Sequence, residues 1–166
     1  MTEPARPIKR LFLSWAHRDV RLKSSLVASL AEQLRILRGV DFEWWEDSHI
    51  NTGEAWRREI LGRLNESDYA VQLTSPSFFA SNFIVKHELP PFTTGEPHKG
   101  ALPVGLRPVP LDGQAELYGI DRLQIFRLDG KCFSELTSAA HRDRFARELA
   151  ADIQRRVLHA DPWRSV

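Results

Sequence analysis

Residues 69–74, Tyr-Ala-Val-Gln-Leu-Thr, constrain the fold of this chain more than any other segment. They are apolar at nearly every position, and a run without polar/apolar alternation predicts a strand covered on both faces. Ser75-Pro76 follows, and the residue before a proline avoids the helical conformation, so the strand should end there in a turn. A strand buried on both faces is typical of a parallel sheet flanked by helices.

The rest of the chain alternates between strand and helix patterns, as such a sheet requires. Strand patterns occur in residues 10–15, 40–45, 101–109 and 122–128. Apolar residues recur at helical spacing in residues 20–37, 54–66 and 137–159. Pro103, Pro108 and Pro110 confine the fourth strand to a short or edge strand. We therefore expect a flavodoxin-like, doubly wound α/β fold: a five-stranded parallel sheet in the order 2-1-3-4-5 with helices on both faces.

Length and composition fit a single domain. The chain has 166 residues, 42% hydrophobic and 27% charged. We expect the domain to span residues 10–159, between a flexible lead-in (1–9) and a C-terminal tail (160–166). The formal net charge of +1 gives no electrostatic case for binding nucleic acid or membranes. Cys132 is the single cysteine, which excludes an internal disulfide and fits a cytoplasmic location.

One acidic residue lies where this fold would bind a ligand. In open α/β sheets ligands bind past the carboxyl ends of the strands, where the strand order reverses. Here that point lies between the first and third strands, which end near Ser14 and Ser75. The helical segment after Ser75 is capped by Ser81 and carries Glu88, so topology puts Glu88 at the rim of the crevice. The alternative is a solvated surface acid, which is the default for a glutamate.

Four segments, taken together and in order, resemble a bacterial Toll/interleukin-1 receptor (TIR) domain. The resemblance covers roughly residues 8–159. The late segments Arg-Leu-Gln-Ile-Phe (122–126) and Gly-Lys-Cys-Phe (130–133) also resemble bacterial members that act as anti-phage effectors. The four segments are Leu-Phe-Leu-Ser-Trp (11–15) with His-Arg-Asp (17–19), Trp-Trp-Glu-Asp (44–47) with Gly-Glu-Ala-Trp-Arg (53–57), Ser-Pro-Ser-Phe-Phe-Ala-Ser (75–81), and Glu-Leu-Pro (88–90).

The resemblance implies a flavodoxin-like fold and, as in many bacterial members, cleavage of NAD+ between nicotinamide and ribose. The family's catalytic glutamate corresponds to Glu88, and NAD+ is the substrate rather than a cofactor. The loop over residues 47–54 gates the site. Many members become active only when they self-associate. A separate sensor protein that triggers this assembly is a further possible partner. The implied substrate-binding positions are Ser14, Trp15, Trp45, Asp47 in the gating loop, and Ile84.

One departure from the family pattern concerns the position four residues before the glutamate. This position is often Trp or Cys in the family, and here it is Ile84. Phe83 is adjacent but would point about 100° away on a regular helix. If a ring must stack there, Trp15 is the candidate to supply it.

A single carboxylate suffices for this chemistry. Breaking the bond develops positive charge on the ribose, and the nicotinamide of NAD+ is already a cationic leaving group that needs no general acid. A carboxylate that binds the ribose hydroxyls and faces the oxocarbenium-like centre is attracted more strongly in the transition state than in the ground state. Hydrolysis and cyclisation share this step, so the sequence does not distinguish between them.

Several alternatives stay open at this stage. Ser14 either contacts a ligand or only stabilises the turn after the first strand. Trp44 and Trp45 are consecutive on a strand and should face opposite sides, so only one of them can reach the crevice. The histidines lack a metal-binding spacing, and we expect no metal site. A non-catalytic TIR interaction module, or an enzyme acting on another nucleotide, competes with the NAD+-cleaving enzyme.

Overall fold

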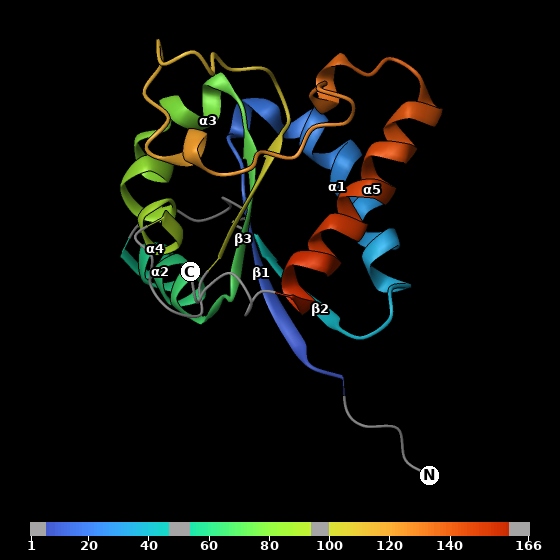
Figure 1. Ribbon diagram of the computed structural model, residues 1–166. Coiled ribbons are helices and arrows are strands. Elements are labelled where there is room, and N and C mark those ends of the chain that lie inside the picture. The colour runs from blue at the N-terminus through green and yellow to red at the C-terminus, as the bar shows by residue number, and fades with distance from the viewer. Residues whose placement is uncertain (1–5, 47–53, 94–99, 160–166) are drawn as a thin grey trace.

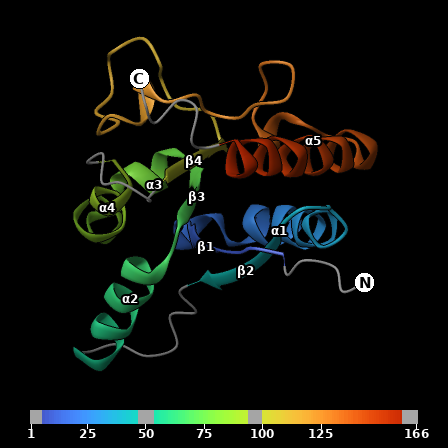
Figure 2. The same cartoon turned by 60° about the horizontal axis from the view of Figure 1, so that its bottom comes forward.

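The computed structural model describes residues 6–46, 54–93 and 100–159, which form three layers. A central sheet separates two helices on one face, α1 (Val20–Arg35) and α5 (Ala139–Leu158), from three on the other. Those three are α2 (Glu54–Glu66), α3 (Pro76–Ala80) and α4 (Pro90–Thr93), and both views show this arrangement (Figures 1 and 2). Among the described residues, no helix is both long enough and apolar enough to cross a membrane.

The sheet is parallel and has the order β2-β1-β3-β4. All six residues of β3 are buried, which confirms the strand predicted from the apolar run and its central place. The expected order of the first four strands is also confirmed. The strands are β1 (Ile8–Ser14), β2 (Asp41–Glu46), β3 (Tyr69–Thr74) and β4 (Gly100–Gly105).

The prediction of a fifth strand over residues 122–128 is wrong. Within the described residues this segment meets β4 through one parallel bridge, between Phe126 and Val104. The next hydrogen bond would need the N–H of residue 103, which is a proline and has none; the carbonyl of Gln124 instead accepts from Arg156 at 3.2 Å.

On the other side of the bridge the chain turns back on itself. The N–H of Leu128 donates to the carbonyl of Lys131 at 2.9 Å. Asp129 and Gly130, at the turn, have φ values of 51° and 77°. Positive φ closes a tight turn, so the Leu128 N–H is not directed at β4. The pairing with β4 therefore stops on both sides of the Val104–Phe126 bridge.

The larger part of the core lies between the sheet and two long helices, α1 (Val20–Arg35) and α5 (Ala139–Leu158). Both helices present an apolar stripe at helical spacing, as predicted. The hydroxyl of Ser138 caps α5 by accepting from the N–H of His141 at 3.1 Å. The buried stripe residues are Leu26, Leu30 and Leu34 of α1 and Phe145, Leu149, Ile153 and Val157 of α5.

The opposite face carries α2 (Glu54–Glu66) and a broken helical segment that positions Glu88. This segment consists of α3 (Pro76–Ala80), the π-helical turn η2 (Ile84–Glu88) and α4 (Pro90–Thr93). Ser75 caps α3 by accepting from the N–H of Phe78 at 3.0 Å. Ser81 has an extended ψ of 114°, and its hydroxyl accepts from the N–H of Ile84 at 3.3 Å. The predicted cap at Ser81 is thus confirmed. Ser81 precedes a second helical segment, which contains the π-helical turn η2.

Candidate active site

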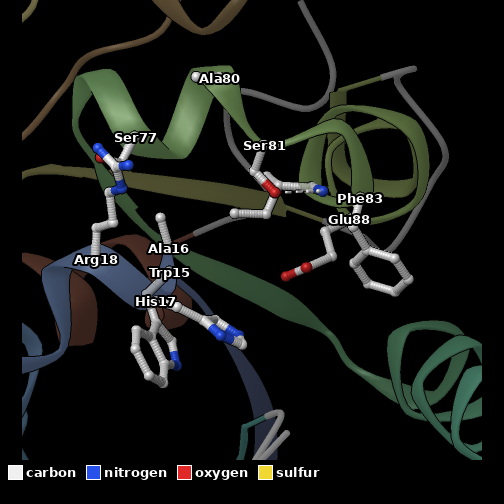
Figure 3. A pocket seen from close by; sticks show the side chains of 10 residues that line it. Trp15, Ala16, His17, Arg18, Ser77, Ala80, Ser81, Phe83 and Glu88 are labelled. Atoms are coloured by element: carbon white, nitrogen blue, oxygen red, sulfur yellow. Dashed lines mark hydrogen bonds between the residues drawn. The ribbon is translucent and has the colours of Figure 1, made fainter. Parts of the chain in front are cut away.

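A cavity of about 650 Å³ opens at the carboxyl-terminal edge of the sheet. One wall is the segment that follows β1, and the other is the helical segment that follows β3 (Figure 3). This is the place that the strand order predicted for a ligand. The residues that line it are Trp15, Ala16, His17, Arg18, Ser77, Ala80, Ser81, Phe83, Ile84 and Glu88.

Glu88 lies in the wall of the cavity and is only 5% exposed. The hydroxyl of Ser14, the last residue of β1, donates to Glu88 Oε1 at 2.7 Å. Ser14 is itself buried, at 1% exposure. A buried carboxylate is costly unless hydrogen bonds stabilise it, and this bond supplies one. The surface-acid alternative for Glu88 therefore does not fit the structure.

Ser14 has a role that neither sequence alternative described. It does not line the cavity, and its hydroxyl contacts Glu88. The two residues are 74 positions apart in the chain. The contact joins the last residue of β1 to the last residue of η2, so the first strand holds the carboxylate.

Trp15 lines the cavity, and a lysine side chain outside the cavity packs against its ring. Lys23 Nζ lies 4.6 Å from the centre of the Trp15 ring, a cation–π contact. The same ammonium group is 2.5 Å from Glu46 Oε2, at the end of β2. The ring of His17 lies 5.6 Å from that of Trp15. Trp15 is therefore an aromatic surface in the cavity wall with a defined orientation.

Ile84 and Phe83 both line the cavity, but they pack in different hydrophobic clusters. Ile84 packs with Phe78 and Phe79, whereas Phe83 packs with the cluster under α2. Adjacent side chains on a regular helix diverge by about 100°. The turn that begins at Ile84 is π-helical, and Phe83 is the residue immediately before it. Its ring packs against that of His87, with 4.9 Å between ring centres. The Phe83 ring thus lines the cavity without packing against Ile84 in the same cluster.

Trp45 is not among the residues that line the cavity. Its ring stacks on Phe12 with 5.2 Å between centres, and the Arg63 guanidinium lies 5.7 Å from it. Trp45 packs with the cluster under α2, whereas Trp44 packs with the core on the α1 and α5 face. The prediction that the two tryptophans face opposite sides is confirmed. Asp47 and most of the gating loop lie outside the described residues.

Two polar residues of the cavity were not singled out from the sequence. Arg18 follows β1 and Ser77 lies in α3, and Figure 3 shows their side chains together, away from Glu88 and Phe83. The cavity therefore carries an acid on one side and a guanidinium on the other. The His-Arg-Asp turn after the first strand was the available signal for Arg18, because polar residues at a strand end of this fold face the ligand.

A buried polar network ties the two walls together. The Ser75 hydroxyl donates to Asp19 Oδ2. Arg107 Nε donates to Asp19 Oδ1 at 2.7 Å, and Arg107 Nη2 donates to Ser77 Oγ at 2.8 Å. Asp19 belongs to the turn after β1, Ser75 and Ser77 to the start of α3, and Arg107 to the loop after β4. Three chain segments are thus joined behind the cavity.

Cys132 lies outside the cavity, and we expect it to be unreactive in the folded protein. Burial raises the pKa of its thiol from 9.0 to about 11; the Glu135 carboxylate adds to the rise and Arg127 opposes it. Because the thiolate is the nucleophile, alkylation by iodoacetamide at pH 8 should be about a hundredfold slower in the folded protein than in urea. Mass spectrometry after timed quenching measures both rates, and equal rates would contradict the burial argument.

The chemistry available in the cavity is that of one buried carboxylate beside aromatic and apolar surface. Among the described residues there is no group of histidine, cysteine and acidic side chains that could hold a metal ion. Glu88 can accept hydrogen bonds from a diol and stabilise a developing cation, and low polarity around it strengthens both effects. The cavity therefore suits a reaction in which a sugar carbon becomes positively charged.

The sequence comparison agrees with the fold and with the position of the cavity. No curated protein matches the chain. A family model described as the TIR domain matches residues 11–139, which is more than half of the chain. The match includes the end of β1 with Ser14, all of β2 to β4, and Glu88. The protein therefore belongs to the TIR domain family.

Proposed function

We propose that this protein is an NAD+ glycohydrolase that cleaves the nicotinamide–ribose bond, with Glu88 as the catalytic residue. The observation that carries the proposal is the buried Glu88 carboxylate in the cavity wall, hydrogen-bonded by Ser14. A glutamate kept for solubility would be exposed. A buried carboxylate at a ligand-binding edge is instead suited to act on a bound molecule.

The proposed mechanism is electrostatic. As the bond to nicotinamide lengthens, the ribose carbon gains positive charge and the nicotinamide ring loses its own. The Glu88 carboxylate, largely shielded from water, attracts the developing charge more strongly than it attracts the ground state. It also accepts hydrogen bonds from the ribose hydroxyls and so orients the sugar. Water or the adenine ring then attacks, giving ADP-ribose or a cyclic isomer.

The other walls of the cavity fit the remaining parts of a dinucleotide. Trp15 and Phe83 offer aromatic surface next to which the nicotinamide ring can pack. Arg18, on the side away from Glu88, is placed to pair with a diphosphate. A volume of about 650 Å³ is within the range of small-molecule sites.

The direct test is product analysis with the wild-type chain. We expect incubation with NAD+ at increasing protein concentration to release nicotinamide, with ADP-ribose or a cyclic isomer as the second product, resolved by chromatography. A steeper than linear dependence on protein concentration would indicate activation by self-association. A substrate panel with other nucleotides tests specificity. Unchanged NAD+ under every assembly condition would refute the proposal and favour a non-catalytic interaction module.

Arg18→Gln should weaken NAD+ binding without disabling the reaction. Loss of one charged hydrogen-bonding partner of the diphosphate should raise KM about tenfold and leave kcat nearly unchanged. Nicotinamide riboside, which has no diphosphate, should be cleaved equally by the variant and the wild type. Arg21→Gln is the matched control, since Arg21 is exposed on α1 and does not line the cavity. An unchanged KM for NAD+ would place the diphosphate elsewhere.

A further inference from the structure

Gln72 is a buried polar residue that the proposed reaction does not use. It lies in the central strand β3 and is 0% exposed. Within the described part of the chain, neither its Nε2 nor its Oε1 has a hydrogen-bond partner. Leaving a buried amide without partners destabilises a fold, and an apolar residue of the same size would avoid that cost. The residue therefore calls for an explanation other than packing.

Gln72 is the direct neighbour of Ser14 across the sheet. The two residues are register partners in the parallel pair of β1 and β3. Adjacent strands lie about 4.8 Å apart, and side chains of paired residues point to the same face. Phe12 and Ala70 lie two residues before Ser14 and Gln72 in their strands and so point to the same face. They pack against residues of α2 and α4, so this is the face that those helices cover. Gln72 thus projects from the sheet next to Ser14, whose hydroxyl holds Glu88.

Thr74, the next polar residue of β3 on this face, has a hydrogen-bond partner, unlike Gln72. Thr74 is 1% exposed, and its hydroxyl donates to the carbonyl of Val104 at 2.9 Å. Gln72 is flanked on its other side by Pro103, its register partner in β4, which has no N–H to offer. Ser14 is therefore the polar side chain that the sheet register brings next to the amide.

We propose that Gln72 is a positioning residue for Glu88 and acts through Ser14. The Ser14 Oγ–H donates to Glu88 Oε1, as the structure shows. The bond from Gln72 Nε2–H to Ser14 Oγ is not made in the structure, and we infer that a change in the Gln72 side-chain torsions forms it when Glu88 is ionised. This role rests on the proposed function.

The physical basis of the role is the orientation of one hydroxyl. Ser14 has a single proton, and its oxygen has two lone pairs. An amide that donates to those lone pairs leaves the proton directed at the carboxylate, and each bond of such a chain strengthens the other. Glu88 is then held in one orientation toward the ribose. Besides Glu88, the charged or titratable residues among those lining the cavity are His17 and Arg18, which the test leaves in place.

Gln72→Met separates this role from a purely structural one. Methionine has a similar volume and no polar groups to bury, so we expect the melting temperature to rise. We expect kcat for NAD+ to fall roughly tenfold with KM unchanged, the effect of losing about one hydrogen bond in the transition state. The ¹³C signal of the Glu88 carboxyl carbon, assigned by its loss in Glu88→Gln, should also move in the absence of NAD+.

Two further variants test the route through Ser14. On a Ser14→Ala background, Gln72→Met should change neither kcat nor the Glu88 signal further, because the intermediate hydroxyl is gone. Thr74→Val is the matched control on the same face of β3. It removes a hydrogen bond that is made, so it should lower the melting temperature and leave kcat and the Glu88 signal unchanged.

The outcomes distinguish this role from the proposed reaction. Wild-type protein without turnover under every assembly condition overturns the reaction and the role together. An active wild type with an equally active Gln72→Met overturns the role alone. A lower melting temperature with an unmoved Glu88 signal shows a structural amide and also overturns the role, whether or not NAD+ is cleaved. Additive effects of the Ser14 and Gln72 changes overturn the route through Ser14.

Discussion

Replacing Glu88 with glutamine should lower kcat for NAD+ cleavage about a thousandfold, since removing one preorganised electrostatic contact costs a factor of this size. The amide oxygen of glutamine can still accept from Ser14, whose hydroxyl donates to Oε1 at 2.7 Å. The substitution therefore removes the charge and keeps the shape and the hydrogen bond. What is lost is the attraction to the sugar cation, so kcat should fall far more than KM rises.

Nicotinamide release measured under the same assembly conditions checks this prediction. Glu59→Gln is the matched control, because Glu59 is an exposed acid on α2 and should keep full activity. Circular dichroism and urea unfolding should show that Glu88→Gln remains folded, since burying an amide is less costly than burying a charge. A Glu88→Gln variant with wild-type turnover would show that another group stabilises the transition state.

Arg107→Met should destabilise the protein by about 3 kcal/mol, the lower end of the range for removing one partner of a buried ion pair. The Asp19 side chain is 2% exposed, and Arg107 Nε donates to it at 2.7 Å. Without Arg107 the carboxylate is left buried with the Ser75 hydroxyl as the contact that remains from the network. The effect belongs at the lower end because the Arg107 side chain is itself 34% exposed.

A second substitution tests that explanation. Arg107→Met combined with Asp19→Asn should recover most of the loss, because the unpaired buried charge is then gone. Arg144→Met is the surface control: Arg144 pairs with Glu148 at 3.3 Å, both side chains are more than 40% exposed, and the change should cost less than about 1 kcal/mol. Urea unfolding with unchanged m-values measures all three variants. Equal losses for Arg107→Met and Arg144→Met would contradict the burial argument.

Helices and strands were predictable where buried apolar residues recur at the spacing of a helix or a strand. The apolar run of residues 69–74 is β3, and the stripe that includes Leu26, Leu30 and Leu34 is α1. The fifth strand was not predictable in this way. Residues 122–128 have a strand composition, but Pro103 in the neighbouring strand and the turn at Asp129 and Gly130 limit them to one bridge. A strand forms only when a neighbouring strand can hydrogen-bond to it, and the local sequence does not show which segment that neighbour is.

The candidate site was predictable in part for a similar reason. Glu88 lines the cavity, as its place after the third strand predicted. Trp15 and Ile84, which the family resemblance implied, line it as well. Trp45 does not line it, since the alternation of a strand predicts that two tryptophans diverge and does not say which one faces the site. Phe83 lines the cavity as well, which its sequence position did not predict.

The sequence by itself determined the alternation of strands and helices, the buried central strand and the edge of the sheet at which a ligand would lie. These follow from local periodicity and from the rules of parallel sheets, which act on neighbouring residues. Only the tertiary structure decided that Ser14 holds Glu88 and that Arg107 pairs with Asp19, across 74 and 88 positions of the chain. A hydrogen bond forms only when the donor–acceptor distance between packed segments is right to within a few tenths of an ångström. Those distances are set by strand register and helix geometry together, and no short segment contains them.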